Sequence, residues 1–209
     1  MLDIITICDR GDNANTYVVG DSDGVIIIDP ANRLSNITTA VKDRKVLGVF
    51  LTHGHYDHFI TLIDVLKMYN VNCYMHQKGF DKLTNLMSSC AMFFGVSALN
   101  PIDKTKVTFV KDNQILELSK NFKIKVITTP GHTDCSVVYQ IEDVMFTGDT
   151  LFNNGVGRTD LPSSNTITLI NSLKKLLDNK NQACIYPGHG WDSTLEDERH
   201  NNDFYKRIR

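Results

Sequence analysis

The segment "THGHYDH" places three histidines and an aspartate within six residues, in a chain that has seven histidines in all. Residues two apart at the end of a strand face the same way, so His53 and His55 could hold one metal ion together. Asp57 and His58 follow about one turn later and could bind a second ion or cap a helix. A lone histidine is more often a core or capping residue, but four donors at this spacing favour a metal site.

Three more donors stand in separate motifs, each directly after an apolar, strand-like run. His132 lies in "TTPGHT", Asp149 in "FTGDT" and His189 in "YPGHG". The glycine in each motif lets the backbone bend sharply and turn the side chain toward a shared cleft. Each motif is weak evidence alone. Together the seven residues, which we call the donor set, suit two borderline divalent cations with three terminal ligands each and one bridging carboxylate: His53, His55, Asp57, His58, His132, Asp149 and His189.

Two histidines lie outside these motifs. His76 ends an apolar strand-like run, and we expect it to be structural. His200 lies in a charged tail, where we expect it to be solvated.

The elements that must position the donors come in two runs of strands. The first run, "DIITIC", "NTYVVG" and "GVIIIDP", is interrupted by turn-rich "RGDN" and "GDSDG", which predicts antiparallel hairpins. A short helix after Ser35 is expected next. "VLGVFLTH" reads as a buried strand, and the apolar spacing after Asp57 predicts a helix, so the histidine cluster falls at a strand-to-helix junction.

The second run of strand-like segments consists of "KVTFV", "QILELS", "FKIKVITT", "SVVYQIE" and "DVMFTGD". A helix over 166–178 follows, with "SSN" before it as capping residues, then a strand in "ACIYPGH" and a helical tail. Two sheets packed face to face would bury both apolar sets. We therefore predict one α+β domain over residues 1–209, an αββα sandwich of two mostly antiparallel sheets with helices on the outer faces.

Composition narrows the class of protein. The 209 residues are 42% hydrophobic and 22% charged, with a net charge of −2, which is ordinary globular usage without the basic surface that nucleic acid requires. There is no apolar run of membrane-spanning length and no secretory signal at the start. Five scattered cysteines without a CxxC pair indicate reduced, mostly buried thiols. We expect a cytoplasmic protein that binds neither nucleic acid nor membrane.

The motifs "THGHYDH", "PGHT", "GDTLF" and "YPGHG", in this order, resemble the metallo-β-lactamase superfamily. "GRTDLP" and the tail "GHGWDSTLEDE" narrow the resemblance to short glyoxalase II-like thioester hydrolases. The resemblance implies a first metal site of His53, His55 and His132. It implies a second site of Asp57, His58 and His189, with Asp149 bridging the two. Zinc is the metal that it implies first, with iron or manganese as alternatives.

The same resemblance implies hydrolysis of a small thioester, acyl-glutathione to acid plus thiol, by a hydroxide that bridges the two metals. Asp57 could orient this nucleophile as well as ligate. A thiol leaves as thiolate without a strong general acid, which favours a thioester over an amide. Full-length glyoxalase II holds glutathione with basic residues of a helical C-terminal domain, whereas this chain ends 20 residues after His189. Short relatives also have a proline where this chain has Asp203, so glutathione is the part of the substrate that the resemblance supports least.

Other functions of the same fold stay open at this point. In a persulfide dioxygenase, a single iron would be held by His53, His132 and Asp149. A lactonase or a phosphodiesterase would use both metals, and a regulatory protein could retain the site without catalysis. Oxygen uptake, ester turnover and the activity of the metal-free protein separate these alternatives.

Two segments near the site carry open alternatives. We expect residues 78–100 to be a mixed helical stretch. They could form a pocket lip through their large apolar side chains, although such a stripe is more often core: Leu86, Met87, Met92, Phe93 and Phe94. Arg158 and Asp160 could contact substrate, but an internal ion pair that shapes the loop after Asp149 is the favoured interpretation.

Overall fold

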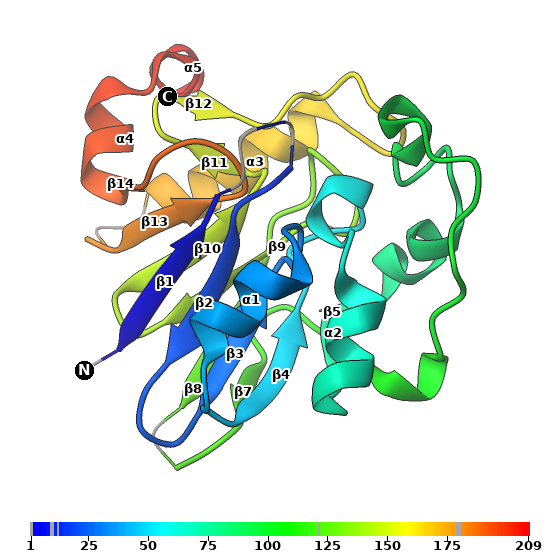
Figure 1. Ribbon diagram of the computed structural model, residues 1–209. Coiled ribbons are helices and arrows are strands. Elements are labelled where there is room, and N and C mark those ends of the chain that lie inside the picture. The colour runs from blue at the N-terminus through cyan, green and yellow to red at the C-terminus, as the bar shows by residue number, and fades with distance from the viewer. Residues whose placement is uncertain (1, 9–10, 12, 121, 179–180) are drawn as a thin grey trace.

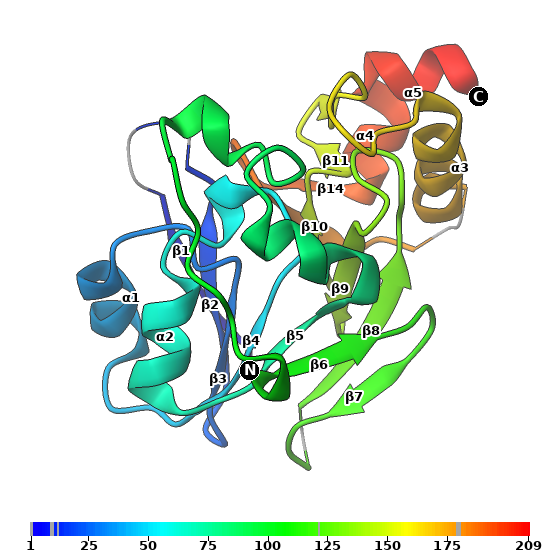
Figure 2. The same ribbon diagram turned by 90° about the vertical axis from the view of Figure 1, so that its right-hand side faces the viewer.

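Two six-stranded sheets lie face to face, and helices cover the outer face of each (Figures 1 and 2). The computed structural model describes residues 2–8, 11, 13–120, 122–178 and 181–209. The predicted αββα sandwich is confirmed. Its three layers of apolar contact, one between the sheets and one beneath each set of helices, correspond to three clusters of buried side chains.

The first sheet has the strand order β1-β2-β3-β4-β5-β6. The predicted hairpins are confirmed, because β1, β2 and β3 pair antiparallel. The remaining pairs, from β3 to β6, are parallel, so the prediction of a mostly antiparallel sheet is wrong here. The strands are Asp3–Ile7, Thr16–Gly20, Val25–Ile28, Val46–Phe50, Cys73–His76 and Val107–Val110.

The parallel pairs follow from the connections between them. Strands joined through a helix return in the same direction, and α1 (Leu34–Val41) and α2 (Leu62–Tyr69) are such crossovers. Strand β4 is almost entirely buried, as its continuous apolar run "VLGVF" indicates. That run was the sequence signal for a parallel strand covered on both faces.

The second sheet has the order β14-β13-β10-β9-β8-β7 and is mostly antiparallel, as predicted. One pair, β10 with β13, is parallel. Its strands are Ile115–Glu117 (β7), Lys123–Thr128 (β8), Val137–Ile141 (β9), Val144–Gly148 (β10), Cys184–Pro187 (β13) and Ser193–Thr194 (β14), and a separate small hairpin is formed by Leu151–Phe152 (β11) and Gly155–Val156 (β12).

Helix α3 (Thr166–Leu177) packs on the second sheet with α4 (Leu195–Asn201) and α5 (Asp203–Ile208). The predicted capping is confirmed, since the side chain of Asn165 accepts a hydrogen bond from the Thr168 amide at 2.9 Å. The apolar side of α3 buries Leu169 and Leu173 against this sheet. No helix within the described residues is long and apolar enough to cross a membrane.

Residues 78–100 differ from the expected mixture of helices. They form only short 3-10 turns, Gln77–Thr84 (η2) and Ala91–Phe94 (η3), joined by irregular backbone. Two residues in the left-handed region, Cys90 with φ 60° and Gly95 with φ 71°, bound η3 and prevent a longer helix. Two further 3-10 turns, Tyr56–His58 (η1) and Lys104–Lys106 (η4), complete the elements of the described chain.

Candidate metal centre

The donor set lies where strand ends from both sheets meet. In the second sheet, β8 and β10 both run antiparallel to β9, and β13 runs parallel to β10, so all three point the same way. The residues that follow their carboxyl ends carry His132, Asp149 and His189. In the first sheet, the carboxyl end of β4 leads to His53, His55 and the 3-10 turn η1. The fold therefore gathers donors that are up to 136 residues apart in the chain, from position 53 to position 189.

The structure brings all seven predicted donors together in overlapping groups. The ligand atoms of His53, His55 and His132 lie within 4.8 Å of one another. The same limit holds for the second group, Asp57, His58 and His189. These are the two triads that the resemblance implied. Their nearest approaches are 2.9 Å between His55 Nδ1 and His132 Nε2, and 3.1 Å between His189 Nε2 and Asp57 Oδ2.

Asp149 lies between the two triads. Its Oδ2 is 3.5 Å from His132 Nε2 in the first triad and 3.7 Å from His189 Nε2 in the second. Its Oδ1 is 3.2 Å from His58 Nε2. A carboxylate with an oxygen close to donors of both groups has the position that a bridging ligand requires.

Fixed hydrogen bonds orient three of the histidine rings. His53 Nδ1 lies 3.1 Å from Thr52 Oγ1, and His132 Nδ1 lies 2.9 Å from the carbonyl oxygen of Arg158. His58 Nδ1 lies 2.8 Å from Asp29 Oδ2. When Nδ1 donates its proton to such an acceptor, the lone pair of Nε2 is left facing the cluster. This arrangement is the one found around histidines that bind metals.

Asp29 is a site residue that sequence reasoning missed. Its buried carboxylate also accepts hydrogen bonds from Thr52, at 2.8 Å from the amide and 2.6 Å from Oγ1. It therefore supports His58 directly and His53 through Thr52. A signal was present in "VIIIDP", where an aspartate follows a buried strand as the donors do. Nothing in the sequence tied it to residues 23 and 29 positions later.

Buried polar atoms without hydrogen-bond partners show that the cluster fits a metal. Among the described residues, Nε2 of His53 and Nε2 of His55 are buried without a hydrogen-bond partner, whereas His58 Nε2 and Asp149 Oδ1 face each other at 3.2 Å. A buried polar atom left unpaired costs about 1–3 kcal/mol. Nitrogen and carboxylate donors concentrated in this way match the ligands that divalent cations such as zinc take.

The protonation states divide the histidines into two kinds. Burial, followed by the neighbouring His132, lowers the pKa of His55 to about 3. Burial, with His58 beside it, also holds the pKa of His53 well below its usual range. Both rings are therefore neutral at pH 7 and have lone pairs available for a cation.

His58 shows the opposite behaviour. Burial works against its charged form, but Asp149, Asp57 and Asp29 more than offset this and hold the pKa of His58 well above its ordinary value. Burial likewise opposes ionisation of Asp149, yet His58 keeps the pKa of this carboxyl far below its ordinary value. Without a cation, the His58 proton supplies the positive charge that the carboxylates need. A bound cation would displace that proton.

Gly188 shows how closely the chain passes the cluster. A Cβ atom at this position would lie 2.6 Å from His58 Cε1 and would overlap Oδ1 of Asp149. The first glycine of "YPGHG", Gly188, is therefore needed because a side chain has no room at this position. The predicted reason, a sharp bend of the backbone, does not apply to Gly188, since its φ is not in the left-handed region.

Five members of the donor set line the floor of an open pocket of about 470 Å³, namely His55, Asp57, His132, Asp149 and His189, and His53 and His58 are buried beneath it. Phe93 and Phe94 line this pocket, so the lip interpretation of residues 78–100 holds for these two side chains. Phe93, Met87 and Met92 are largely exposed, so the favoured core interpretation of the stripe is wrong. Leu86 is half-buried and outside the lining.

The predicted ion pair after Asp149 is confirmed. Arg158 Nε and Nη2 each donate to a carboxylate oxygen of Asp160 at 2.6 Å. The pair is exposed rather than internal, and Arg158 also lines the pocket. The two histidines outside the motifs agree with expectation: His76 accepts a hydrogen bond from the Lys78 amide at the start of η2, and His200 is exposed.

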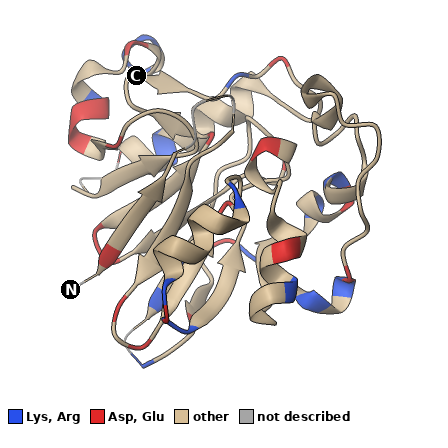
Figure 3. Ribbon diagram, viewed as in Figure 1, with Lys and Arg blue, Asp and Glu red and all other residues tan. Residues whose placement is uncertain are grey.

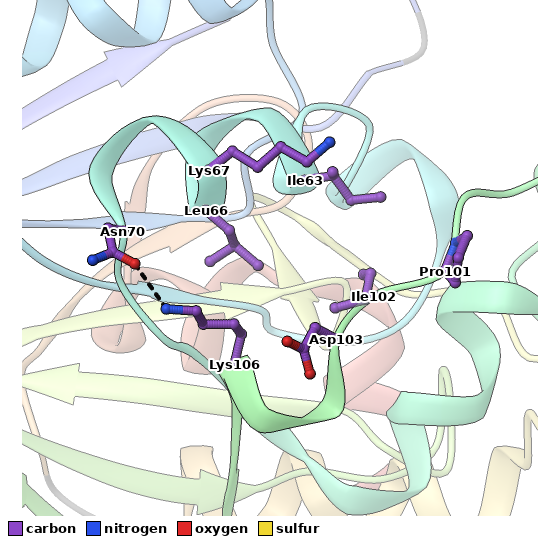
Figure 4. Close-up of a pocket in the computed structure, with 8 residues that line it drawn as sticks. All are labelled: Ile63, Leu66, Lys67, Asn70, Pro101, Ile102, Asp103 and Lys106. Carbon is purple, nitrogen blue, oxygen red and sulfur yellow. Dashed lines mark hydrogen bonds between the residues drawn. The ribbon is translucent and has the colours of Figure 1, made fainter.

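A second hollow of about 330 Å³ lies between α2 and the segment before β6 (Figure 4). Ile63, Leu66 and Ile102 provide apolar surface there, and Lys106 donates a hydrogen bond to Asn70 Oδ1 at 2.8 Å. No member of the donor set lines it. The pocket over the donor set is therefore the candidate active site.

Comparison with known proteins identifies the family. The sequence pattern of the metallo-beta-lactamase superfamily matches residues 9–189. A "probable metallo-hydrolase" of Streptococcus pyogenes is 32% identical over 198 residues, which are 91% of this chain and 85% of that protein. A "probable polyketide biosynthesis zinc-dependent hydrolase" of Bacillus subtilis is 30% identical over 181 residues, which are 84% of this chain and 72% of that protein.

Solved structures agree with this assignment. BLEG-1, a B3 metallo-beta-lactamase, superposes with a TM-score of 0.86 at 28% identity, covering 98% of this chain and 99% of that one. TTHA1623, solved in a di-iron-bound form, gives 0.82 at 26% identity over 97% and 99% of the two chains. ETHE1 from Myxococcus xanthus gives 0.77 at 25% identity over 96% and 83%. The chain belongs to the metallo-β-lactamase superfamily and has its fold; it is a metal-dependent hydrolase of that superfamily.

Proposed function

We propose that the protein is a dinuclear metal-dependent hydrolase of a small thioester, similar to glyoxalase II. The observation that carries the proposal is the pair of donor triads joined by Asp149. We assign His53, His55 and His132 to one cation, and Asp57, His58 and His189 to the other. Two bound cations would supply a hydroxide nucleophile at neutral pH and polarise the substrate carbonyl.

The chain's own residues have distinct roles in this proposal. Asp149 holds the two triads at a fixed separation and contributes its negative charge between them. Asp57 faces both His58 and His189, with its Oδ2 at 3.6 Å and 3.1 Å from their Nε2 atoms. The carboxylate oxygen of Asp57 can therefore accept a hydrogen bond from the attacking nucleophile and orient it toward the carbonyl.

The pocket walls favour a thioester over an amide. Of the residues that line the pocket, the carboxylic acids are Asp57 and Asp149, and both belong to the donor set. An amine leaving group needs a proton from a general acid, and neither residue has a spare one to give. A thiol with an ordinary pKa of about 8.5 departs as thiolate without this help.

The metals and the partner class also belong to the proposal. Zinc is the metal we assign first, supported by the zinc-dependent relative, and the di-iron form of TTHA1623 supports iron as an alternative. The pocket volume suits a small molecule. In Figure 3 basic and acidic residues are interspersed over the visible face, which favours a small substrate over a polyanion such as RNA. A cytoplasmic location stays a prediction.

The test uses metal-free protein reloaded with zinc, iron or manganese. Metal content, hydrolysis of S-D-lactoylglutathione and of a panel of simpler thioesters, and oxygen uptake with glutathione persulfide are measured together. The proposal expects about two cations per chain and thioester turnover that requires them. Asp149→Asn should lose turnover, whereas Asp103→Asn, which changes an exposed carboxylate on the segment before η4, should not.

Each outcome separates the alternatives. Oxygen uptake with one iron per chain and no thioester turnover would replace the proposal with a persulfide dioxygenase. Two filled sites without thioester turnover would direct the search to lactones or phosphodiesters. Full activity in the Asp149→Asn variant would contradict the bridging role.

A further inference from the structure

The walls of the active-site pocket are almost entirely apolar once the donor set is set aside. Seven other residues line it, and Arg158 is the one that carries a charge. The remaining six are Cys90, Phe93, Phe94, Phe152, Val156 and Leu161. Whatever part of a substrate extends from the reacting carbonyl must therefore lie against hydrocarbon and aromatic surface.

The wall at residues 89–94 is held in place although its tip is exposed. Ser89 and Ala91 are fully buried, and the Ser89 carbonyl oxygen accepts a hydrogen bond from the Tyr56 amide at 2.8 Å. This contact joins the segment to the residue that precedes Asp57. The turn η3 is therefore fixed beside the metal centre before any substrate arrives.

The tip of this segment presents apolar side chains to water. Three consecutive apolar residues are exposed there, at 54% for Met92, 74% for Phe93 and 37% for Phe94. Runs of exposed apolar residues are unfavourable for solubility and mark binding surfaces when they rim a cavity. Phe93 has the largest exposed fraction of the pocket-lining aromatic residues, so a bound ligand can remove the most apolar surface from water there.

The charge in the pocket wall is already balanced. Arg158 donates two hydrogen bonds to Asp160, so the pair is close to neutral as a unit. A glutathione group carries two carboxylates and an ammonium group, and binding them requires unpaired charges on the protein. The seven wall residues offer none beyond the paired Arg158.

We infer that the substrate is a thioester with an uncharged apolar group attached next to the scissile carbonyl, and that Phe93 and Phe94 are its specificity-determining contacts. This inference rests on the proposed function and names the substrate class of the same site. The apolar group can belong to the acyl half or to the thiol half of the molecule. Both would cover the same aromatic surface.

The test measures kcat/KM of the zinc-loaded protein along two series of thioesters. In one series the acyl chain grows from acetyl through butanoyl and hexanoyl to octanoyl on N-acetylcysteamine; in the other, acetate is joined to ethyl, butyl and hexyl thiols. We expect kcat/KM to rise roughly two- to fourfold per methylene in one series, since a buried methylene contributes up to about fourfold. The series that responds identifies the half that carries the apolar group. S-D-lactoylglutathione should be a poorer substrate than the longest members.

Variants test whether Phe93 is responsible for the dependence of kcat/KM on chain length. Phe93→Ala should flatten the dependence on chain length, and Phe93→Leu should retain most of it because an apolar side chain remains. Ile63→Ala, which trims the second hollow in Figure 4, should leave the dependence unchanged. A readout independent of turnover is calorimetric binding of butanoate, hexanoate and octanoate, whose Kd should fall with length in the wild type and vary less in Phe93→Ala.

The outcomes are distinguishable. Turnover of thioesters with a flat profile in both series would overturn the inference and leave the proposed function standing. A chain-length dependence that survives Phe93→Ala, or disappears in Ile63→Ala, would also overturn it. If no thioester is hydrolysed, the proposed function fails and this inference fails with it.

Discussion

Replacing Asp29 by asparagine should weaken metal binding while leaving the fold almost unchanged. In the wild type, one carboxylate oxygen accepts from the Thr52 amide, and the other accepts from Thr52 Oγ1 and His58 Nδ1. In Asp29→Asn, the amide oxygen can keep the first bond. The amide nitrogen, however, must donate where the carboxylate accepted, so both of its partners must change roles.

These changes from donor to acceptor alter the protonation of the ring nitrogens that face the metal site. In the metal-free variant His58 Nδ1 must accept, so the ring gives up its Nδ1 proton and keeps the proton on Nε2, the atom that faces the cluster. Thr52 Oγ1 must also accept, so it turns its own proton toward His53 Nδ1, 3.1 Å away, and favours the same shift in His53. Restoring the binding tautomer leaves a buried N–H or O–H donor without an acceptor, which costs about 1–3 kcal/mol. Metal affinity should therefore fall roughly 5- to 150-fold for each histidine affected.

The assay is competition between a chromogenic chelator and chelator-stripped protein, with urea unfolding of the same metal-free samples. Asp29→Asn should lower the affinity in both sites and change the free energy of unfolding by less than about 1 kcal/mol, because every buried group keeps a partner. Asp178→Asn, which alters a carboxylate bonded to Tyr205 on the far side of the second sheet, is the matched control. Wild-type affinity in Asp29→Asn would refute the reasoning about tautomers.

Three further predictions concern two substitutions and the titration of one carboxyl group. Glu198→Ala should reduce the free energy of unfolding by about 3 kcal/mol in urea denaturation, because the buried carboxylate accepts three separate hydrogen bonds. Gly188→Ala should lower metal-dependent turnover at least tenfold, because the new methyl group overlaps the Asp149 carboxylate. Asp160 should titrate by NMR with a pKa of about 2, since the hydrogen bond from Arg158 holds the pKa of this carboxyl below 3.8. Because the folded-state pKa is depressed, the pair stabilises the protein above about pH 4 and loses this effect as pH falls through 2.

Each of these expectations has a control and a contradicting result. Gly155→Ala has ordinary van der Waals room for its methyl group and should retain turnover, so equal loss in both glycine variants would point to a general effect on folding. Arg158→Gln should return the pKa of Asp160 toward 3.8. An unchanged Asp160 titration in that variant would contradict the ion pair, and wild-type stability of Glu198→Ala would contradict its buried hydrogen bonds.

The donors were predictable from sequence because each one follows a strand and stands in a turn. That local rule placed His132, Asp149 and His189 correctly without knowledge of which strands are neighbours. The supporting residue Asp29 obeys the same rule but lacked a motif of its own. Its partners Thr52 and His58 are reached only through the parallel pairing of β3 with β4, which local patterns do not reveal.

The errors have similar physical causes. Strand direction depends on how the chain returns between strands, so the hairpin pattern of β1–β3 was wrongly extended to the helix-connected strands that follow. The apolar stripe at Met92 and Phe93 has the composition of a core segment. Exposure is decided by what packs against a segment, and here an open pocket takes the place of a neighbouring element.

Each donor triad takes residues from both halves of the chain, His53 and His55 with His132 in one, and Asp57 and His58 with His189 in the other. A bound cation is thus a reversible cross-link between the two sheets, closing loops of at least 77 residues, the separation of positions 55 and 132. Such cross-links stabilise the folded chain in proportion to the logarithm of free metal concentration. The apparent melting temperature and the resistance to proteolysis should therefore follow metal supply, so that scarcity of the ion would shorten the lifetime of the protein as well as stop its chemistry.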